Sequence, residues 1–528
     1  MGHRGYSFEV RNKYVGHVNL VNAGRAIVRR SEVGLSRTPL FEVFFALAAL
    51  AAAIYLGYVL IHYSNLDGYL DHIEPNIAAS AWWFMGGHAL FPKPDDWPIF
   101  IGYGPLLTFI HSSVFNFAGG SIAMSKLANS VVSVGSVLVM FAYARNRFGG
   151  HRACIGILLF VAVILIYAPI SFWNRPDPFI VFLVALAVFT KGLSTEKWGN
   201  WAPHLIVGIC IGLAVNLKVH AFIYFIPIAI DLCGWKGIRQ MIIIGLISIA
   251  VFLLPFAHPQ ISIEANISII FENLSAQKRF DTGLLIKALK YSMLFLAPGF
   301  LLVGLLVRGR HNIQAKDAIY FAALTLSTAF ALFPSSNLGM GSYHLLPLLA
   351  ISIDSFLRFL NGFDDTPRLQ KGIMIFFPLL FLLISIPVQR RLTRNMDRIT
   401  LENVAEEVVQ VTQRLQNKSL QVGYGQSFEK YRFSYFKIIP MFTGQPITID
   451  AQTMMEFNFI GIDLSHKLAA DIEACKTRNW LIPKGEQPFT LKSYYTGKRL
   501  FGQTPQIFLH RYEKSESLKY FDLWTCKG

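Results

Sequence analysis

The chain has 528 residues, of which 53% are hydrophobic and 15% are charged, and its mean hydropathy is +0.43. Because soluble domains are roughly 25% charged on average, this composition excludes an ordinary soluble protein. The net charge of +16 does not indicate nucleic acid as a partner, since much of the basic excess lies in short loops between apolar segments and no basic-aromatic module accompanies it. We expect these charges to set the membrane topology and to attract anionic lipid, with the lipid bilayer as a partner.

Apolar segments that could cross a hydrocarbon core of about 30 Å recur between residues 39 and 388. They are preceded by the polar and basic residues 1–38, which predict a cytoplasmic N-terminus ahead of a signal-anchor helix. The expected spans are residues 39–62, 122–144, 153–172, 179–192, 203–217, 219–232, 240–257, 284–307, 317–334, 343–360 and 371–388. The apolar piece 103–117 contains Pro105 and is expected to lie at the membrane surface or to be re-entrant.

Charges in the connecting loops predict the orientation of these spans. With the N-terminus inside, every expected inside loop is basic, as the positive-inside rule requires. The basic residues of these loops are Arg145, Arg147, Arg152, Lys191, Lys197, Lys236, Arg239, Arg308, Arg310, Lys316, Arg368 and Lys371. The expected outside segments carry most of the acidic residues, and about eleven spans place everything after Val388 outside the cytoplasm.

Residues 389–528 are more polar than the apolar spans before them and predict a compact α+β domain outside the cytoplasm. Leu401–Gln416 has a helix-like charge pattern. Gln445–Ile449 and Gln506–His510 alternate as strands do, and glycines and prolines separate these stretches.

The five cysteines fall into two groups. Cys154, Cys210 and Cys233 lie in or beside apolar segments and are expected to be small core residues. Cys475 and Cys526 lie in the external domain, where an oxidising compartment would allow a disulfide. The sequence does not fix the distance between them, so the bonded and the free state both remain open.

The long first external loop, residues 63–121, carries a cluster of side chains that could take part in a chemical reaction. Asp71, His72 and Glu74 stand just beyond the first span, where the membrane meets water. Keeping an acidic group charged there costs little free energy, and the group lies close to the head group of a lipid-linked ligand. The alternative interpretation is that they only cap a helix that begins near Asn76. The cluster lacks a second, spaced group of ligands, so we predict no metal site, although a divalent metal remains possible.

The sequence DHIEPNIAASAWWFMGGHALFPKP at Asp71–Pro94, followed by YGPL at Tyr103–Leu106, resembles the first external loop of the GT-C superfamily of polyprenyl-phosphate-dependent glycosyltransferases. The similar enzymes are the family-39-like transferases, which include the protein mannosyltransferases and the aminoarabinose transferase of lipid A. Three later segments resemble the same enzymes, namely NRPDPFIVFL at Asn174–Leu183, GLAVNLKVHAFIYFIPIAI at Gly212–Ile230 and SYHLLPLLAISI at Ser342–Ile353. The resemblance covers roughly residues 39–388.

The resemblance implies a polytopic α-helical membrane protein with a GT-C-like fold. It also implies an inverting glycosyltransferase that moves a sugar from a polyprenyl-phosphate donor to a glycan, lipid or protein acceptor on the extracytoplasmic face. In this family an acidic residue of the first external loop acts as general base on the acceptor, which implies Asp71 or Glu74 here. We favour Asp71 because it leads the motif, and we expect partial desolvation to raise its pKa.

The phosphate that leaves the sugar needs cations or amide donors around it. Arg175, Lys218 and His220 are the candidates nearest the predicted external membrane surface. For Arg175 the alternative is an ion pair with Asp177, and for Lys218 it is snorkelling to the interface.

Four further residues are expected to bind substrate: His72, Tyr103, Tyr343 and His344. The alternative interpretation of His344 is a histidine with satisfied hydrogen bonds in the core. Three tryptophans of the first external loop are expected to form an interfacial aromatic belt, namely Trp82, Trp83 and Trp97.

Two other functions remain open. A transporter or flippase for a lipid or polar solute is favoured by the number of helices and by Lys218, but the lack of an internal repeat and the long acidic first loop count against it. A non-catalytic scaffold for envelope polysaccharide assembly is also compatible, although Asp71 and Glu74 are intact. The expected location is the bacterial inner membrane.

Overall fold

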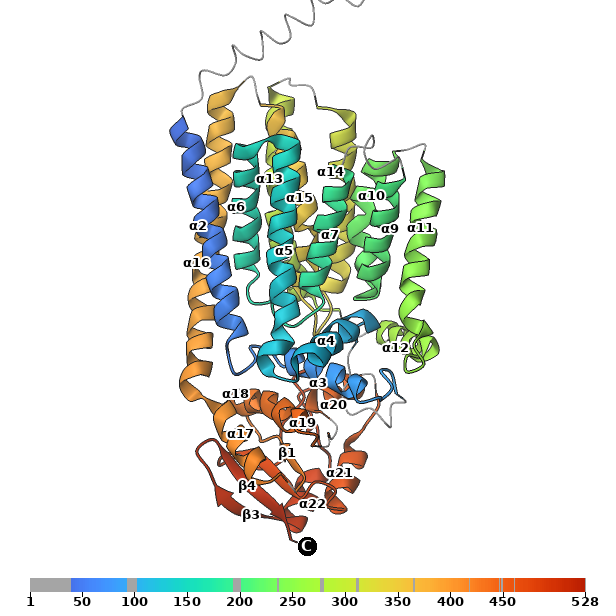
Figure 1. The fold of residues 1–528 in the computed structure, drawn as a ribbon, viewed down its shortest axis with the longest axis vertical. Coiled ribbons are helices and arrows are strands. Elements are labelled where there is room, and N and C mark those ends of the chain that lie inside the picture. The colour runs from blue at the N-terminus through green and yellow to red at the C-terminus, as the bar shows by residue number, and fades with distance from the viewer. Residues whose placement is uncertain are drawn as a thin grey trace, which may run out of the picture.

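The computed structural model describes residues 39–92, 102–192, 201–234, 237–275, 280–309, 313–363, 366–416, 418–445, 447, 450–459 and 461–527. A bundle of long helices forms one part of the molecule and a smaller domain with a sheet forms the other (Figure 1). The predicted N-terminal segment 1–38, Trp97 and most of Gln445–Ile449 lie outside the described residues.

Each predicted span coincides with a helix or with two consecutive helices of the bundle. The helices are α2 (Pro39–Ser64), α5 (Ile122–Phe148), α6 (Gly150–Ile166), α7 (Asp177–Lys191), α9 (Ala202–Val215), η3 (Val219–Phe225) with α10 (Ile226–Cys233), α11 (Ile238–Leu253) with η4 (Leu254–Ala257), α13 (Thr282–Arg308), α14 (Ala315–Ser335), η6 (Ser342–Leu348) with α15 (Leu349–Asn361), and α16 (Pro367–Glu402). Among the described residues, seven helical stretches are long and apolar enough to cross a membrane. The polytopic α-helical membrane fold is thereby confirmed, and the number of eleven spans stays a prediction.

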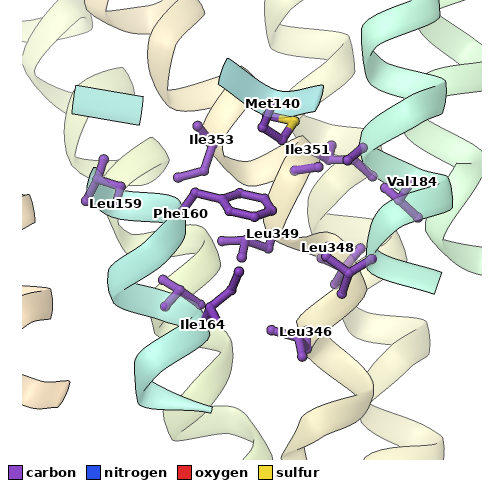
Figure 2. Packing of buried hydrophobic residues seen from close by; sticks show 14 of the residues in the cluster. Met140, Leu159, Phe160, Ile164, Val184, Leu346, Leu348, Leu349, Ile351 and Ile353 are labelled. Carbon is purple, nitrogen blue, oxygen red and sulfur yellow. The ribbon is translucent and has the colours of Figure 1, made fainter. Parts of the chain in front are cut away.

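The η6–α15 segment lies at the centre of the bundle. Other elements bury 89% of its most apolar stretch, whereas only 6% of the corresponding stretch of α11 is buried. Figure 2 shows Leu349 and Ile353 of α15 beside Phe160 of α6, with Val184 of α7 on the other side. Because lipid tails are as apolar as these side chains, close packing rather than water exclusion holds such helices together. The face of α11 that lacks protein neighbours is therefore available to lipid.

Three shorter helices lie across the end of the bundle that faces the smaller domain (Figure 1). They are α3 (Ile73–Met85), α4 (Pro105–Ala118) and α12 (Ile263–Ser275). The apolar piece predicted at residues 103–117 is α4, which begins at Pro105 because proline fits the first helical turn. The helix expected near Asn76 is α3, which begins three residues earlier.

The C-terminal domain has a mixed four-stranded sheet and several short helices, which confirms the predicted α+β class. α16 continues from the bundle into this domain and is followed by α17 (Val404–Arg414). The strands are β1 (Leu420–Val422), β2 (Asn479–Pro483), β3 (Tyr512–Ser517) and β4 (Phe521–Cys526) in the order β1-β2-β4-β3, with β1 parallel to β2 and the other pairs antiparallel. The helices are α18 (Phe428–Tyr431), η7 (Arg432–Lys437), α19 (Ile438–Phe442), α20 (Ala451–Phe459), α21 (Ser465–Glu473) and α22 (Thr504–Arg511).

One predicted strand of this domain is wrong. Gln506–His510 belongs to helix α22, which Pro505 starts in its first turn. Five residues are too short a window to separate strand alternation from one turn of helix, and here only Phe508 of the window is fully buried. Cys475 and Cys526 form a disulfide, so the bonded alternative is confirmed, and Cys210 is buried as expected of a core residue.

The C-terminal domain docks on α3 through a buried polar cluster. The Asn76 amide donates to Asp450 Oδ2 at 2.8 Å and accepts from Lys437 Nζ at 2.6 Å, and Lys437 also pairs with Asp450. Beside it, the Trp82 ring packs edge-on against Phe442 of α19 at 5.1 Å. Trp82 is thus part of a domain contact, although an interfacial aromatic belt was expected. The docking fixes the C-terminal domain next to the start of α3, where Asp71 lies.

Candidate active site

The loop between α2 and α3 is held by a lysine of the bundle. Lys126 of α5 is fully buried, and its Nζ donates hydrogen bonds to the carbonyl oxygens of Tyr63 at 3.1 Å, Leu66 at 2.7 Å and Gly68 at 2.7 Å. A buried ammonium needs such partners because the free energy of removing it from water is large. Its position inside the predicted span 122–144 was the available signal, since ionisable residues within apolar spans are rare and mark structural or functional sites.

Replacing Lys126 with methionine is expected to destabilise the protein by about 3–5 kcal/mol, because three buried carbonyls lose their donor and the Glu74 carboxylate loses a cation that stabilises its charge. Thermal unfolding of the detergent-solubilised protein would measure this change. Lys290→Met is the matched control, since Lys290 is exposed on α13. Equal melting temperatures for the two variants would contradict the role of Lys126.

The loop between α6 and α7, which carries Arg175, is fixed by the same face of α5. Asn129 lies three residues after Lys126, hence on the same helix face. Its side-chain amide donates to the carbonyl oxygens of Trp173 and Arg175, both at 2.7 Å. One helix therefore positions the two loops relative to each other.

Asp71 lies at the entrance of α3 in contact with Arg175. Its Oδ1 accepts from Arg175 Nη2 at 2.8 Å and from the Ile73 backbone amide at 2.9 Å, while His72 Nδ1 lies 3.5 Å from Oδ2. Burial raises the pKa of Asp71, but the charges of Arg175 and His72 outweigh burial and lower this pKa to about 2. The predicted upward shift is therefore wrong, because the sequence did not reveal the direct contact with a guanidinium. The bond to Ile73 also gives Asp71 the helix-capping contact of the alternative interpretation.

Glu74 is fully buried and its carboxylate oxygens are occupied. Oε2 accepts from the backbone amides of Leu70 at 2.8 Å and Asp71 at 3.0 Å, and Oε1 accepts from the Tyr63 hydroxyl and from the Asn174 amide at 3.3 Å. Burial raises the pKa of Glu74. These contacts connect the Glu74 carboxylate to the loop that carries Asp71.

Lys218 pairs with Asp177 rather than lying free at the interface. Lys218 Nζ and Asp177 Oδ1 are 2.6 Å apart, and both side chains are buried. Two alternatives are thereby wrong: Lys218 does not snorkel, and Arg175 does not pair with Asp177. Asp177 opens α7 and faces the turn between α9 and η3, whereas Arg175, on the preceding loop, faces Asp71.

Aromatic rings connect the two ion pairs. The Arg175 guanidinium lies 5.4 Å and Lys218 Nζ lies 5.0 Å from the centre of the Tyr343 ring, and Lys218 Nζ also lies 5.6 Å from the Tyr103 ring. Such cation–π contacts stabilise the cations without using all of their hydrogen-bond donors. In the described part of the chain, Arg175 Nε and Asp177 Oδ2 have no hydrogen-bond partner. Arg175 therefore keeps a donor that an anionic ligand could use.

The two predicted histidines meet next to this cluster. His220 Nε2 and His344 Nδ1 are 3.0 Å apart, and the Tyr224 hydroxyl donates to the His344 carbonyl oxygen at 2.7 Å. His344 is buried and directly follows Tyr343, and His220 follows Lys218 by two residues. His344 thus has the hydrogen-bond partner of a core histidine, and both imidazoles lie beside the cations.

Gly104, in the YGPL segment, touches the backbone that leads to Lys218. Its amide donates to the Leu217 carbonyl oxygen at 3.3 Å, and a Cβ at this position would lie 2.0 Å from the Asn216 carbonyl oxygen. Only glycine allows this close backbone approach. The contact fixes Tyr103 next to Lys218.

Gly104→Ala is expected to lower kcat/KM by about 100-fold, because a displacement of about 1 Å in a positioned group has that effect. Steady-state kinetics would measure the loss. Gly57→Ala on α2 is the control, since a Cβ there meets no atom within 4 Å. A Gly104→Ala enzyme as active as this control would show that the approach of the two segments does not matter.

The C-terminal domain brings aromatic side chains to Asp71 that no sequence motif indicated. The His72 ring lies 6.0 Å from the ring of Tyr494 and 6.4 Å from that of Tyr431. The Tyr494 hydroxyl donates to Gln452 at 2.9 Å, and the Tyr495 hydroxyl donates to Glu456 at 2.6 Å. Adjacent tyrosines have no distinctive spacing, so only the docking of the domain on α3 reveals them.

Asp71, His72 and Glu74 are metal ligands by residue type. The carboxylate of Glu74 points to the backbone amides around it and not to His72. No group of three potential ligands gathers as a metal site within the described residues.

Part of the chain matches a known protein family. Residues 98–259 match the family described as dolichyl-phosphate-mannose-protein mannosyltransferase. This segment includes Tyr103, Arg175, Lys218 and His220. No curated protein sequence matches the chain significantly.

The fold is similar to that of ArnT from Cupriavidus metallidurans. The structure of ArnT bound to undecaprenyl phosphate and its apo structure both align with a TM-score of 0.53 and 10% sequence identity, over 91% of this chain and 97% of ArnT. Nearly the whole of both chains therefore shares one fold, C-terminal domain included. The chain thus shares the fold of ArnT, and its residues 98–259 match the family described as dolichyl-phosphate-mannose-protein mannosyltransferase.

Proposed function

We propose that the chain transfers a sugar from a polyprenyl-phosphate donor to a hydroxyl of a glycan, lipid or protein acceptor, with inversion at the anomeric carbon. The observation that carries this proposal is the meeting of a carboxylate and two cations around one ring. Asp71 contacts Arg175, and Arg175 and Lys218 both lie over Tyr343. A base for the acceptor and cations for the departing phosphate are the groups that such a displacement requires.

Arg175 and Lys218 are the proposed phosphate-binding residues. As the bond between the anomeric carbon and the phosphate oxygen breaks, its electron pair moves to the phosphate, which becomes a dianionic monoester. Arginine matches the geometry of phosphate oxygens and lysine adds a point charge. His220, beside Lys218, can add a further hydrogen bond. ArnT, which shares the fold, binds undecaprenyl phosphate, and this supports a polyprenyl phosphate as the lipid carrier here.

Donor binding and the base are coupled through Arg175. In the structure the guanidinium is held by Asp71 at 2.8 Å. A donor phosphate competes for the same guanidinium, and Asp71 then loses the cation that lowers its pKa. Burial, which raises the pKa of Asp71, is then opposed only by the weaker effects of His72 and the Ile73 amide, so this pKa rises. Asp71 becomes a stronger base when the donor is present, and takes the proton of the acceptor hydroxyl as the hydroxyl oxygen attacks the anomeric carbon.

The acceptor is proposed to reach Asp71 from the side of the C-terminal domain. His72 and Tyr494 lie there, and Tyr494 is 41% exposed. Tyrosine rings suit sugar faces as well as apolar chains, since each ring has an apolar body and a polar tip. Tyr103, whose ring lies near Lys218, and His344, whose ring stacks on Tyr343, are proposed to contact the donor sugar.

The reaction is proposed to take place on the outer face of the bacterial inner membrane, with a cytoplasmic N-terminus and a periplasmic C-terminal domain. Basic loops at the opposite end of the bundle support this orientation through the positive-inside rule. The disulfide between Cys475 and Cys526 supports an oxidising compartment around the C-terminal domain.

The configuration of the product tests the single-displacement chemistry. Proton NMR of the product, formed from a donor of known anomeric configuration, is expected to show the opposite configuration at the anomeric carbon. Asp71 acts as base in such a displacement and never bonds to the sugar. Retention of configuration would contradict the proposal, because it requires a covalent intermediate on the protein or an attack from the same face.

A further inference from the structure

An apolar groove runs along the outside of the bundle, away from Asp71 and Arg175. α2 and α16 both pack on α6, and the groove between them has a volume of about 1090 Å³. In Figure 1 these two helices lie side by side at one edge of the bundle. The space exists because α2 presents small side chains, among them Ala51 and Ala52, opposite the larger Leu383 of α16.

One end of the groove is basic. Arg390 and Arg394 line it at the end that leads to the C-terminal domain, directly after the apolar part of α16. They are four residues apart, so both lie on one face of the helix. Both are exposed, and among the described residues neither has a carboxylate within ion-pair distance. Arg394 Nε donates to the Arg390 carbonyl oxygen at 3.2 Å.

The positive-inside rule does not account for these arginines. The basic loops lie at the other end of the bundle, whereas Gln389–Arg398 contains Arg390, Arg391, Arg394 and Arg398 next to the C-terminal domain. Uncompensated guanidinium groups at the edge of an apolar groove match one kind of ligand, an amphiphile with an anionic phosphate. Its chain would fill the alanine-lined part and its phosphate would lie between Arg390 and Arg394.

We propose that this groove binds an anionic glycerophospholipid of the surrounding bilayer, with its phosphate on Arg390 and Arg394 and one acyl chain along Ala51 and Leu383. The Gln389 side chain closes the bottom of the groove, since it donates to the Leu165 carbonyl oxygen at 2.7 Å and accepts from Tyr55 at 3.5 Å. A bilayer lipid is the occupant that reaches a groove open to the lipid phase. The donor's carrier phosphate is instead assigned to Arg175 and Lys218, which do not line the groove.

The test measures which lipid stays bound. The full chain is reconstituted with equal amounts of phosphatidylglycerol and phosphatidylcholine and a smaller amount of polyprenyl phosphate, and retained lipids are identified by native mass spectrometry. Wild type is expected to retain phosphatidylglycerol over phosphatidylcholine by roughly tenfold, since each arginine at the membrane surface favours anionic lipid. The double variant Arg390→Gln and Arg394→Gln is expected to lose this preference. Arg391→Gln with Arg398→Gln removes the same charge from the same helix outside the groove and is expected to keep it.

A second pair of variants tests the apolar part. Ala51→Trp fills the groove from a position with an exposed side chain, and is expected to reduce phospholipid retention without lowering the melting temperature. Ile54→Trp adds a similar ring on α2 outside the groove and is expected to have no effect. The proposal is overturned if the two arginine double variants retain the same lipids, if Ala51→Trp matches Ile54→Trp, or if polyprenyl phosphate is the lipid whose retention depends on Arg390 and Arg394.

Discussion

Asp71→Asn is expected to lower kcat by about 10³-fold or more, since a positioned general base contributes about 10²–10⁴-fold. Asparagine has the same shape and can still accept the hydrogen bond from the Ile73 amide, so the entrance of α3 is preserved. The amide cannot take a proton from the acceptor. Steady-state kinetics with a lipid-linked sugar donor would measure the loss, and donor binding measured separately is expected to be retained.

Two control variants make this result specific to Asp71. Asp67→Asn alters an exposed aspartate of the same loop and is expected to leave kcat unchanged. Glu74→Gln disturbs buried backbone contacts, and is expected to lower stability rather than to abolish the chemical step. Turnover by Asp71→Asn at the rate of Asp67→Asn would rule out Asp71 as the base.

Arg175→Gln is expected to reduce kcat/KM by about 10²–10³-fold, because a preorganised donor to a developing oxyanion contributes about 2.7–4 kcal/mol. The same substitution is expected to change the pH dependence. Arg175 is the strongest influence that lowers the pKa of Asp71, and without it burial is opposed only by the weaker effects of His72 and the Ile73 amide, so this pKa rises. A base with a higher pKa becomes protonated at higher pH, so the acid limb of the kcat/KM profile moves to higher pH.

Lys218→Met separates the effect of Arg175 on the donor phosphate from its effect on the pKa of Asp71. Lys218 pairs with Asp177 and does not contact Asp71, so its loss is expected to weaken donor binding and leave the acid limb in place. The pH profiles of wild type, Arg175→Gln and Lys218→Met would be compared at saturating acceptor. An unshifted acid limb in Arg175→Gln would show that Arg175 does not control the ionisation of Asp71.

Much of the helical architecture could be predicted because apolar length and loop charge are local properties of the sequence. Each expected span corresponds to a helix, and α4 begins at Pro105, which a first-turn proline predicts. The strand predicted at Gln506–His510 is wrong, because five residues do not distinguish a strand from a helix. Pro505, which lies in the first turn of α22, stands just before these residues.

The structure brings several of the predicted site residues together, but the sequence did not predict which of them form ion pairs. Asp71, Arg175, Lys218 and Tyr343 come from four separate segments, and the structure brings them together. Which carboxylate holds which cation depends on how α7 and the loop before it are oriented, and this is a tertiary property. For the same reason the low pKa of Asp71 could not be foreseen, since it follows from one guanidinium at 2.8 Å.

Residues that position the site escaped prediction for a different reason. Lys126 could have been singled out as an ionisable residue within an apolar span, but Lys126 and Asn129 donate hydrogen bonds to backbone carbonyls, and no residue type identifies which carbonyls these are. Tyr494 depends on the docking of the C-terminal domain through Asn76 and Asp450, which are 374 positions apart. Contacts over such separations are invisible to local patterns.

The most direct test of the account offers the purified protein a panel of radiolabelled sugars, each linked to a polyprenyl monophosphate, to a polyprenyl pyrophosphate or to a nucleotide. We expect that at least one polyprenyl-monophosphate sugar is consumed with release of polyprenyl phosphate, and that sugars on the other two carriers are not. Consumption of a nucleotide-linked sugar, or neither binding nor turnover of any lipid-linked sugar in the panel, would contradict it.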